Sequence, residues 1–268
     1  MRITTPLCAA LLMAAAPVLN SCSDTGTAPV DQTPGAADPK DQNQASASGD
    51  YAVDFLSDAL FEELIVEIDY VSGFAPSASA LETLEDTLVE LCRKPVGISV
   101  IVDDGIAPEP GAVRGTADIV ALELQHRDFY RDPATKVAVL YCIYLDGRSD
   151  RDEGNLRVLG LAYRGSSCAM FLESIEASEP GLPLFAEIED TVLLHEAGHL
   201  LGLVNNGTPM VAAHEDTEHP AHDSSADCIM HWLIETQNVV DVLLTGKPDF
   251  DAECRADMIA NGGRAPGA

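Results

Sequence analysis

Basic residues are scarce in this chain of 268 residues, where 15 lysines and arginines stand against 44 aspartates and glutamates and the formal net charge is −29. Such a surface repels phosphate backbones and anionic lipids, which excludes nucleic-acid binding and polybasic membrane binding as expected functions. A long hydrophobic run is also missing, because the apolar stretch from Leu7 to Val18 is too short for a permanent membrane span. Internal repeats are absent as well.

The N-terminus carries an export signal instead. Arg2 supplies a positive charge before the apolar stretch, which ends in Leu19-Asn20-Ser21-Cys22. This ending resembles a bacterial lipobox, which implies a signal peptide over residues 1–21 and lipidation of Cys22 as the first mature residue. The alternative is an ordinary signal peptide cut near the same point. We therefore expect an exported protein, lipid-anchored to a bacterial membrane on the periplasmic or cell-surface side, that meets the membrane only through this anchor.

Residues 22–50 are rich in Ala, Ser, Thr, Asp, Gln and Pro and nearly lack large apolar side chains. This composition cannot bury enough surface to offset the entropy of ordering, so it predicts a flexible tether. Residues 51–268 remain, a length suited to one domain with a sizeable core.

The pattern of that domain predicts an α+β (mixed α/β) fold. Runs rich in β-branched residues predict strands over residues 64–71, 97–102, 136–145, 157–163 and 167–175. Helical spacing predicts helices over residues 79–91, 116–127 and 235–244, and a last one that begins after Asp251. A further, long helix follows Gly181 and Pro183.

This long helix contains the motif His195-Glu196-Ala197-Gly198-His199. Residues four apart lie on one helix face, so both imidazoles can reach one metal ion, and Glu196 stands beside them to take a proton from water. Six of the seven histidines of the chain lie between His195 and His231. Two unrelated histidines on a helix would not explain this cluster, which favours a zinc centre.

The motif resembles that of the metzincin clan of zinc peptidases, HExxHxxGxxH followed by a Met-turn. His195, Glu196, His199 and Gly202 match, but Asn205 stands where the third histidine is expected. An asparagine amide is a poor zinc ligand beside imidazole, so that role is not carried over to Asn205.

Archaemetzincin-like proteins offer a better alignment, with residues 204–221 as an insertion. Their motif continues as a histidine, a cysteine, four residues, a second cysteine, one residue and a methionine. His222, Cys228 and Met230 keep this spacing, and Asp223 replaces the first cysteine. The resemblance implies His222 as the third zinc ligand and Met230 as the Met-turn residue.

Other third ligands remain open. His219 and His214 are the alternative histidines, and a carboxylate such as Glu215 or Glu218 is the last candidate. Some metzincins have a tyrosine two residues after the Met-turn methionine. This chain has Trp232 there, which we interpret as a core or pocket-wall residue.

The resemblance also bears on the cysteines. Beyond Cys8 and Cys22 the chain has an odd number: Cys92, Cys142, Cys168, Cys228 and Cys254. Archaemetzincins hold a second, structural zinc with four cysteines, and the matching positions here are Asp223, Cys228, Cys254 and Asp257. Two carboxylates in place of thiolates argue against a tight structural zinc. A disulfide between Cys228 and Cys254 is the hypothesis for the remaining pair, since exported proteins favour disulfides.

The function that the resemblance implies is a zinc-dependent endopeptidase with Glu196 as general base and a peptide or protein as substrate. The fold that it implies is a twisted mixed sheet of about five strands with a small C-terminal helical subdomain. One edge strand, either 157–163 or 167–175, would bind the substrate.

Two other functions compete with this one. A non-catalytic zinc-binding exported lipoprotein would close the site with a fourth protein ligand, for instance His214 or His219. The retained Glu196 argues against it, because a closed site needs no base. A surface interaction module is compatible with the acidic surface, but the sequence contains no binding motif for it.

Overall fold

The computed structural model describes residues 38–178 and 183–267. Its contacts divide the chain into residues 1–36 and residues 37–268, and the fold below concerns the second unit. The predicted signal peptide, the lipidation at Cys22 and most of the predicted tether lie outside the described residues. Among the helices that are described, none is both long and apolar enough to cross a membrane.

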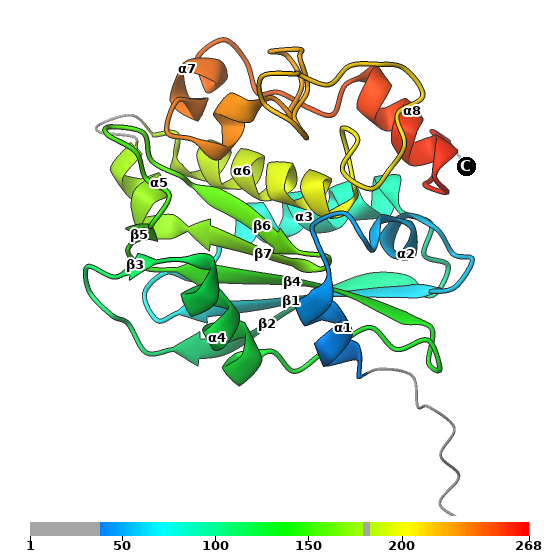
Figure 1. Ribbon diagram of the computed structural model, residues 1–268, viewed down its shortest axis with the longest axis horizontal. Helices are drawn as coiled ribbons and strands as arrows, with labels where there is room; N and C mark the ends of the chain where they lie inside the picture. The colour runs from blue at the N-terminus through cyan, green and yellow to red at the C-terminus, as the bar shows by residue number, and fades with distance from the viewer. Residues whose placement is uncertain (1–37, 179–182, 268) are drawn as a thin grey trace, which may run out of the picture. The chain divides into compact units, whose positions relative to one another are not determined.

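A five-stranded sheet organises this unit, in the order β2-β1-β4-β7-β6 (Figure 1). Its strands are β1 (Glu63–Val71), β2 (Gly97–Ile106), β4 (Val137–Leu145), β6 (Gly160–Arg164) and β7 (Ser167–Phe171). Neighbours among β2, β1, β4 and β7 run parallel, whereas β6 forms one edge and runs antiparallel to β7. The short strands β3 (Val113–Arg114) and β5 (Arg148–Ser149) pair separately. The predicted mixed α/β fold with about five strands is confirmed.

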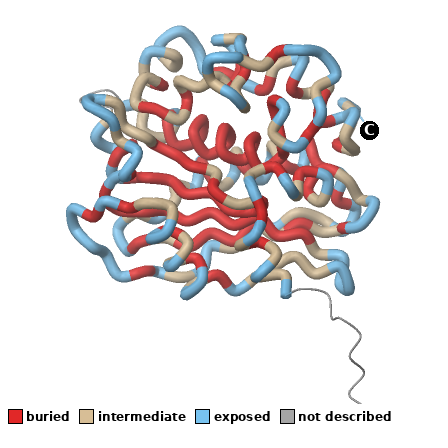
Figure 2. Tube along the Cα trace, viewed as in Figure 1, coloured by how far each residue is buried: buried red, intermediate tan, exposed pale blue. Residues whose placement is uncertain are grey.

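Two cores cover the two faces of the sheet, and Figure 2 shows the central strands buried between them. Alternation along β4 divides its side chains, because successive residues of a strand point to opposite faces. Cys142 and Tyr144 belong to the larger core, while Tyr141 and Ile143 belong to the smaller one. Coverage on both faces explains why β4 is a nearly continuous apolar run.

The larger core is built under helices α3 (Ala78–Leu91) and α6 (Phe185–Leu200). From Ile188 to Leu200 every residue of α6 is buried (Figure 2). A helix without a solvent face needs cover on all sides. The sheet lies on one side of α6, and the C-terminal elements lie on the other (Figure 1): the 3₁₀ helix η1 (Trp232–Glu235), α7 (Val239–Leu243) and α8 (Ala252–Ala260). These elements share the larger core through Ile234, Val239 and Cys254.

Several predicted boundaries shift. The strand predicted over 157–163 begins only at Gly160. The strand predicted over 167–175 ends at Phe171, and helix α5 (Leu172–Ser178) follows directly. The helix predicted over 235–244 is two short pieces, η1 and α7, with a turn between them. Helices α4 (Thr116–His126), on the face of the smaller core, and α8, capped by the Asp251 side chain, begin where the sequence predicts.

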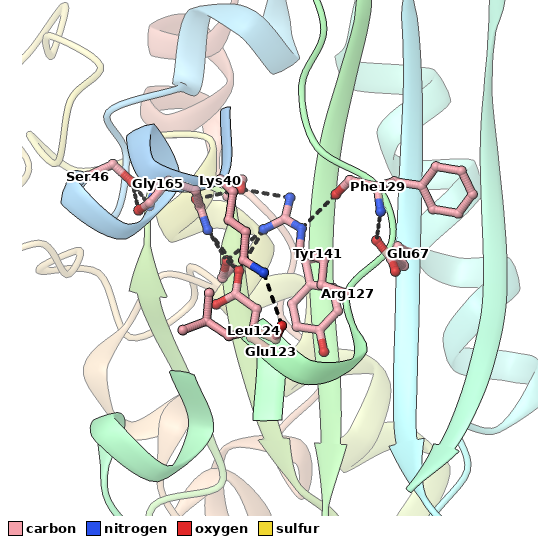
Figure 3. A network of polar contacts seen from close by, with 12 residues as sticks. Lys40, Ser46, Glu67, Glu123, Leu124, Arg127, Phe129, Tyr141 and Gly165 are labelled. Carbon is pink, nitrogen blue, oxygen red and sulfur yellow. Dashed lines mark hydrogen bonds and ion pairs between the residues drawn. The ribbon is translucent and has the colours of Figure 1, made fainter. Parts of the chain in front are cut away.

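The predicted tether is wrong in its last part, because α1 (Pro39–Ala45) belongs to the folded domain. Helix α2 (Ala52–Leu56) follows at the start of the predicted domain. The segment in question is therefore α1. Asn43 of α1 is 2% exposed. Its amide donates to Glu123 at 2.8 Å and to Ser167 at 3.1 Å. Figure 3 shows Glu123 in this network beside Arg127. Glu123 also pairs with Arg127 at 2.8 Å in a nearly solvent-free environment. A polar network rather than apolar burial therefore orders this segment, and composition gives no sign of it.

Candidate metal centre

His195 and His199 lie one turn apart on α6, and their Nε2 atoms are 3.1 Å from each other. Two ligand atoms of a tetrahedral zinc are about 3.3 Å apart for Zn–N bonds of about 2.05 Å. The Nδ1–H of His195 donates to the carbonyl oxygen of Ile229 at 2.7 Å. This hydrogen bond fixes the tautomer and leaves the Nε2 lone pair for a metal.

Burial keeps these two imidazoles neutral. It lowers the pKa of His195 well below its ordinary value and lowers the pKa of His199 to about 3, and neighbouring histidines add to both shifts. Neutral imidazole is the form that binds metal.

His222 completes a group of three convergent rings. Its ring centroid is 5.3 Å from that of His195 and 4.9 Å from that of His199. Its Nδ1–H donates to the carbonyl oxygen of Pro220 at 3.1 Å, and its buried Nε2 has no hydrogen-bond partner among the described residues. Ala221, just before it, has a φ of 66°, a left-handed conformation that L residues rarely adopt. This strained backbone conformation occurs at the residue where the chain turns His222 towards α6.

The other candidates for the third ligand lie elsewhere. Both ring nitrogens of His214 contact carboxylates, Asp223 at 2.5 Å and Asp257 at 2.9 Å. His219 bonds to Asp216 at 2.7 Å and stacks on Trp232, with ring centroids 4.2 Å apart.

The remaining two positions are also engaged outside the centre. Asn205 donates to Glu215 at 3.2 Å, and Glu215 in turn accepts from the amide of Ala221 at 3.1 Å. Glu218 is exposed. Of the candidate ligands for the catalytic metal, the structure brings His195, His199 and His222 together, and the other candidates for the third ligand lie apart from them.

Glu196 is fully buried, and both of its carboxylate oxygens lack a hydrogen-bond partner among the described residues. Burial raises its pKa well above the ordinary value, and the charge of Glu235 raises it further. Gly160, the first residue of β6, passes so close that an added Cβ would lie 2.7 Å from Cγ of Glu196. The carboxyl group is thus enclosed between α6 and the edge strand, with its oxygens free to act on a proton.

Glu235, at the end of η1, is the residue of the centre that sequence reasoning missed. One of its carboxylate oxygens and one ring nitrogen each of His195, His199 and His222 all lie within 4.8 Å of one another. Its Oε1 is 3.8 Å from Nε2 of His222. Burial alone would raise the pKa of Glu235, but His222 and His195 outweigh it and the pKa is lowered. The only signal in the sequence is that Glu235 is the sole acidic residue between Ile229 and Val240.

Three imidazole nitrogens and a carboxylate oxygen form a donor set that suits zinc. The buried, unpartnered Nε2 of His222 and the convergence of the other two nitrogens on the same point fit such an ion. Met230 is fully buried against Gly198, where an added Cβ would lie 3.3 Å from Cε of Met230. Met230 therefore supports α6 between its two histidines.

No protein-family model matches the chain, and no curated protein matches it. Among solved structures, the chain is similar to a zinc-dependent peptidase from Methanocorpusculum labreanum, with a TM-score of 0.49 and 18% sequence identity over 72% of this chain and 99% of that chain. A likeness of this degree does not bear on chemistry, which has to be inferred from the side chains themselves.

A disulfide between Cys228 and Cys254 is not formed. Both are free, buried thiols whose Sγ atoms are 3.7 Å apart, compared with about 2.05 Å for a disulfide bond. The Sγ atom of Cys254 instead approaches Asp223 at 3.7 Å.

A second group of possible metal ligands contains Asp223 and Cys254. His214, Asp223, Asp251 and Cys254 each bring a ligand atom within 4.8 Å of the others. However, the imidazole of His214 already lies between two carboxylates and uses both ring nitrogens. Burial opposes its charge, but Asp223 and Asp257 outweigh this, so the pKa of His214 is raised. These hydrogen bonds compete with a metal ion for the same groups.

Proposed function

We propose that this protein is a zinc-dependent peptidase in which His195, His199 and His222 hold the metal and Glu196 moves the proton. One observation carries the proposal: three buried histidine nitrogens converge next to the buried Glu196, whose carboxylate oxygens have no hydrogen-bond partner among the described residues. A structural metal site would not need the second of these features. Zinc, when bound, supplies Lewis acidity, lowering the pKa of a bound water towards about 7.

Glu196 is suited to act as the general base and then as the general acid. Burial raises its pKa above that of an exposed glutamate, so this carboxyl group holds a proton more readily. It takes a proton from the attacking water and delivers it to the leaving amine of the peptide. Gly160 leaves just enough space for this side chain, and thereby fixes where the proton is held.

Strand β6 supports a peptide or protein as the substrate. It has a strand partner on one side only, β7, and begins at Gly160 against Glu196. An extended peptide can add to such an edge through main-chain hydrogen bonds. Of the two strands considered from the sequence, 160–164 is thus the one that the proposal assigns to the substrate. Export and a lipid anchor at Cys22 remain part of the proposal on the strength of the sequence.

The experiment compares zinc content and peptide hydrolysis for the purified full chain, Glu196→Gln and the control Glu218→Gln, which makes the same charge change at an exposed site. We expect all three proteins to bind one zinc at the centre. Glu196→Gln should lose about 10² to 10⁴-fold in kcat, the contribution of a positioned acid–base group. A wild-type protein that is loaded with zinc but cleaves no member of a diverse peptide library would refute the proposal.

A non-catalytic zinc protein is the second candidate, and Glu235 is the observation that favours it. This function requires a fourth protein ligand, and Glu235 stands where His214 and His219 do not. The same library assay separates the two functions, because a permanently closed site gives zinc binding without cleavage.

A further inference from the structure

Glu235 and His222 face each other in an arrangement that needs a cation. Because Nδ1 of His222 donates to the carbonyl of Pro220, its neutral form presents the Nε2 lone pair towards Oε1 of Glu235. Two acceptors at 3.8 Å repel each other unless positive charge lies between them. The nitrogens of His195 and His199 converge on the same region, so one divalent ion would satisfy all four groups.

The backbone holds Glu235 in this place. Its carbonyl oxygen accepts from the amide of Leu159 at 2.8 Å, and the next residue, Thr236, bridges to Val158. The 3₁₀ helix that carries it is capped by the side chain of His231. The position of Glu235 is therefore fixed by the chain that leads into β6, and not by its own side chain.

The side chain of Glu235 can still leave. It is 32% exposed, whereas the His222 side chain is 11% exposed. Water is therefore available to a displaced carboxylate. The main-chain hydrogen bond from Leu159 to Glu235 lies next to Gly160. A peptide that adds to β6 would therefore lie beside Glu235.

We propose that Glu235 is the fourth protein ligand of the zinc in the resting protein, and that it closes the site until a peptide displaces it. The resting centre then has three histidine ligands and one glutamate ligand, and this glutamate occupies the fourth coordination position. This inference rests on the proposed function for the displacement step, whereas the ligand assignment rests on the geometry alone. It also explains how one protein has both a general base, which a permanently closed site does not need, and a fourth protein ligand, which a permanently open site lacks.

The test measures zinc affinity by chelator competition for the full chain, Glu235→Gln and the control Glu218→Gln. Loss of a ligand should weaken zinc binding at least as much as loss of a group that only supports one, which costs about 10 to 100-fold. The visible spectrum of the Co²⁺-loaded protein should change in Glu235→Gln only. Peptide hydrolysis per metal-loaded molecule should rise in Glu235→Gln, because a coordination position is freed.

Each outcome decides one of the two claims. Unchanged zinc affinity and an unchanged Co²⁺ spectrum in Glu235→Gln would overturn the ligand assignment, even if wild-type cleavage depends on Glu196. Lower hydrolysis per loaded molecule would overturn the self-blocking role. If no variant cleaves peptides but affinity and spectrum depend on Glu235, the peptidase proposal fails while the ligand assignment stands. Should Glu235→Gln fail to fold, as circular dichroism would show, Glu235→Asp keeps the charge but withdraws the oxygen, and should still weaken zinc binding.

Discussion

Replacing Gly160 with alanine adds one methyl group where β6 passes the carboxyl group of Glu196. The new carbon would lie 2.7 Å from Cγ and 2.8 Å from Cδ of Glu196. Carbon atoms in contact prefer about 3.5 to 4.0 Å, so the carboxyl group has to move by about 1 Å. The backbone itself tolerates alanine, because Gly160 is not in the left-handed region.

A misplacement of about 1 Å in a catalytic group costs about 10²-fold in rate, or about 2.7 kcal/mol of transition-state stabilisation. We therefore expect Gly160→Ala to lower kcat/KM about 100-fold while zinc content stays at the wild-type level, since none of the three histidines lies on β6. The assay is steady-state peptide hydrolysis alongside metal analysis and a thermal melt.

The matched control is Gly105→Ala in β2, where the nearest atom to the new carbon is Ser72 Oγ at 3.4 Å, an ordinary contact. It should keep wild-type activity. If Gly160→Ala is as active as the wild type while Glu196→Gln is inactive, the close approach of β6 does not position the base and the reasoning is refuted. Loss of zinc from Gly160→Ala would show that the methyl group acts through the metal ligands instead.

Three further predictions concern stability. Gly198→Ala should lower the free energy of unfolding by about 1–3 kcal/mol in chemical denaturation, because its Cβ would press on Met230 and lie 3.0 Å from Phe250; an unchanged midpoint would contradict this packing. The folded-state pKa of His214 is raised, so the stability that His214 contributes is fully present below about pH 6.5 and is lost as pH rises through the folded-state pKa. The urea midpoint should therefore fall as pH rises, and His214→Ala should remove this dependence. Asn43→Ala should cost about 1–3 kcal/mol, seen as a lower melting temperature with unchanged zinc affinity, since the buried Glu123 loses one of its donors and the buried Ser166 hydroxyl loses its acceptor; a wild-type melt would mean that α1 is not held by this network.

The sequence predicts those parts that depend on local pattern. The apolar run of β4 and the placement of His195 and His199 on one helix follow from periodicity alone, and the structure contains both elements. The end of β7 is missed because apolar residues continue from β7 into α5, and a strand and a helix would both bury them.

Contacts between distant segments are harder to predict. Three loop histidines were candidates for the third ligand because no local pattern says how residues 204–221 fold back. The sequence does not predict Glu235 for the same reason, since its approach to His222 depends on the pairing of the chain after η1 with the chain before β6. Helix α1 is missed because it is stabilised by polar partners that lie more than 75 residues away.

The position of His214 between Asp223 and Asp257 has a consequence for where this protein can remain folded. The imidazole of His214 joins its loop to helix α8 through Asp257 and also bonds to Asp223. These are hydrogen bonds between protein groups, which need neither zinc nor an oxidant. The C-terminal region should therefore stay in place in zinc-poor or reducing surroundings, and a chelator that empties the centre at His195 should leave this second attachment intact.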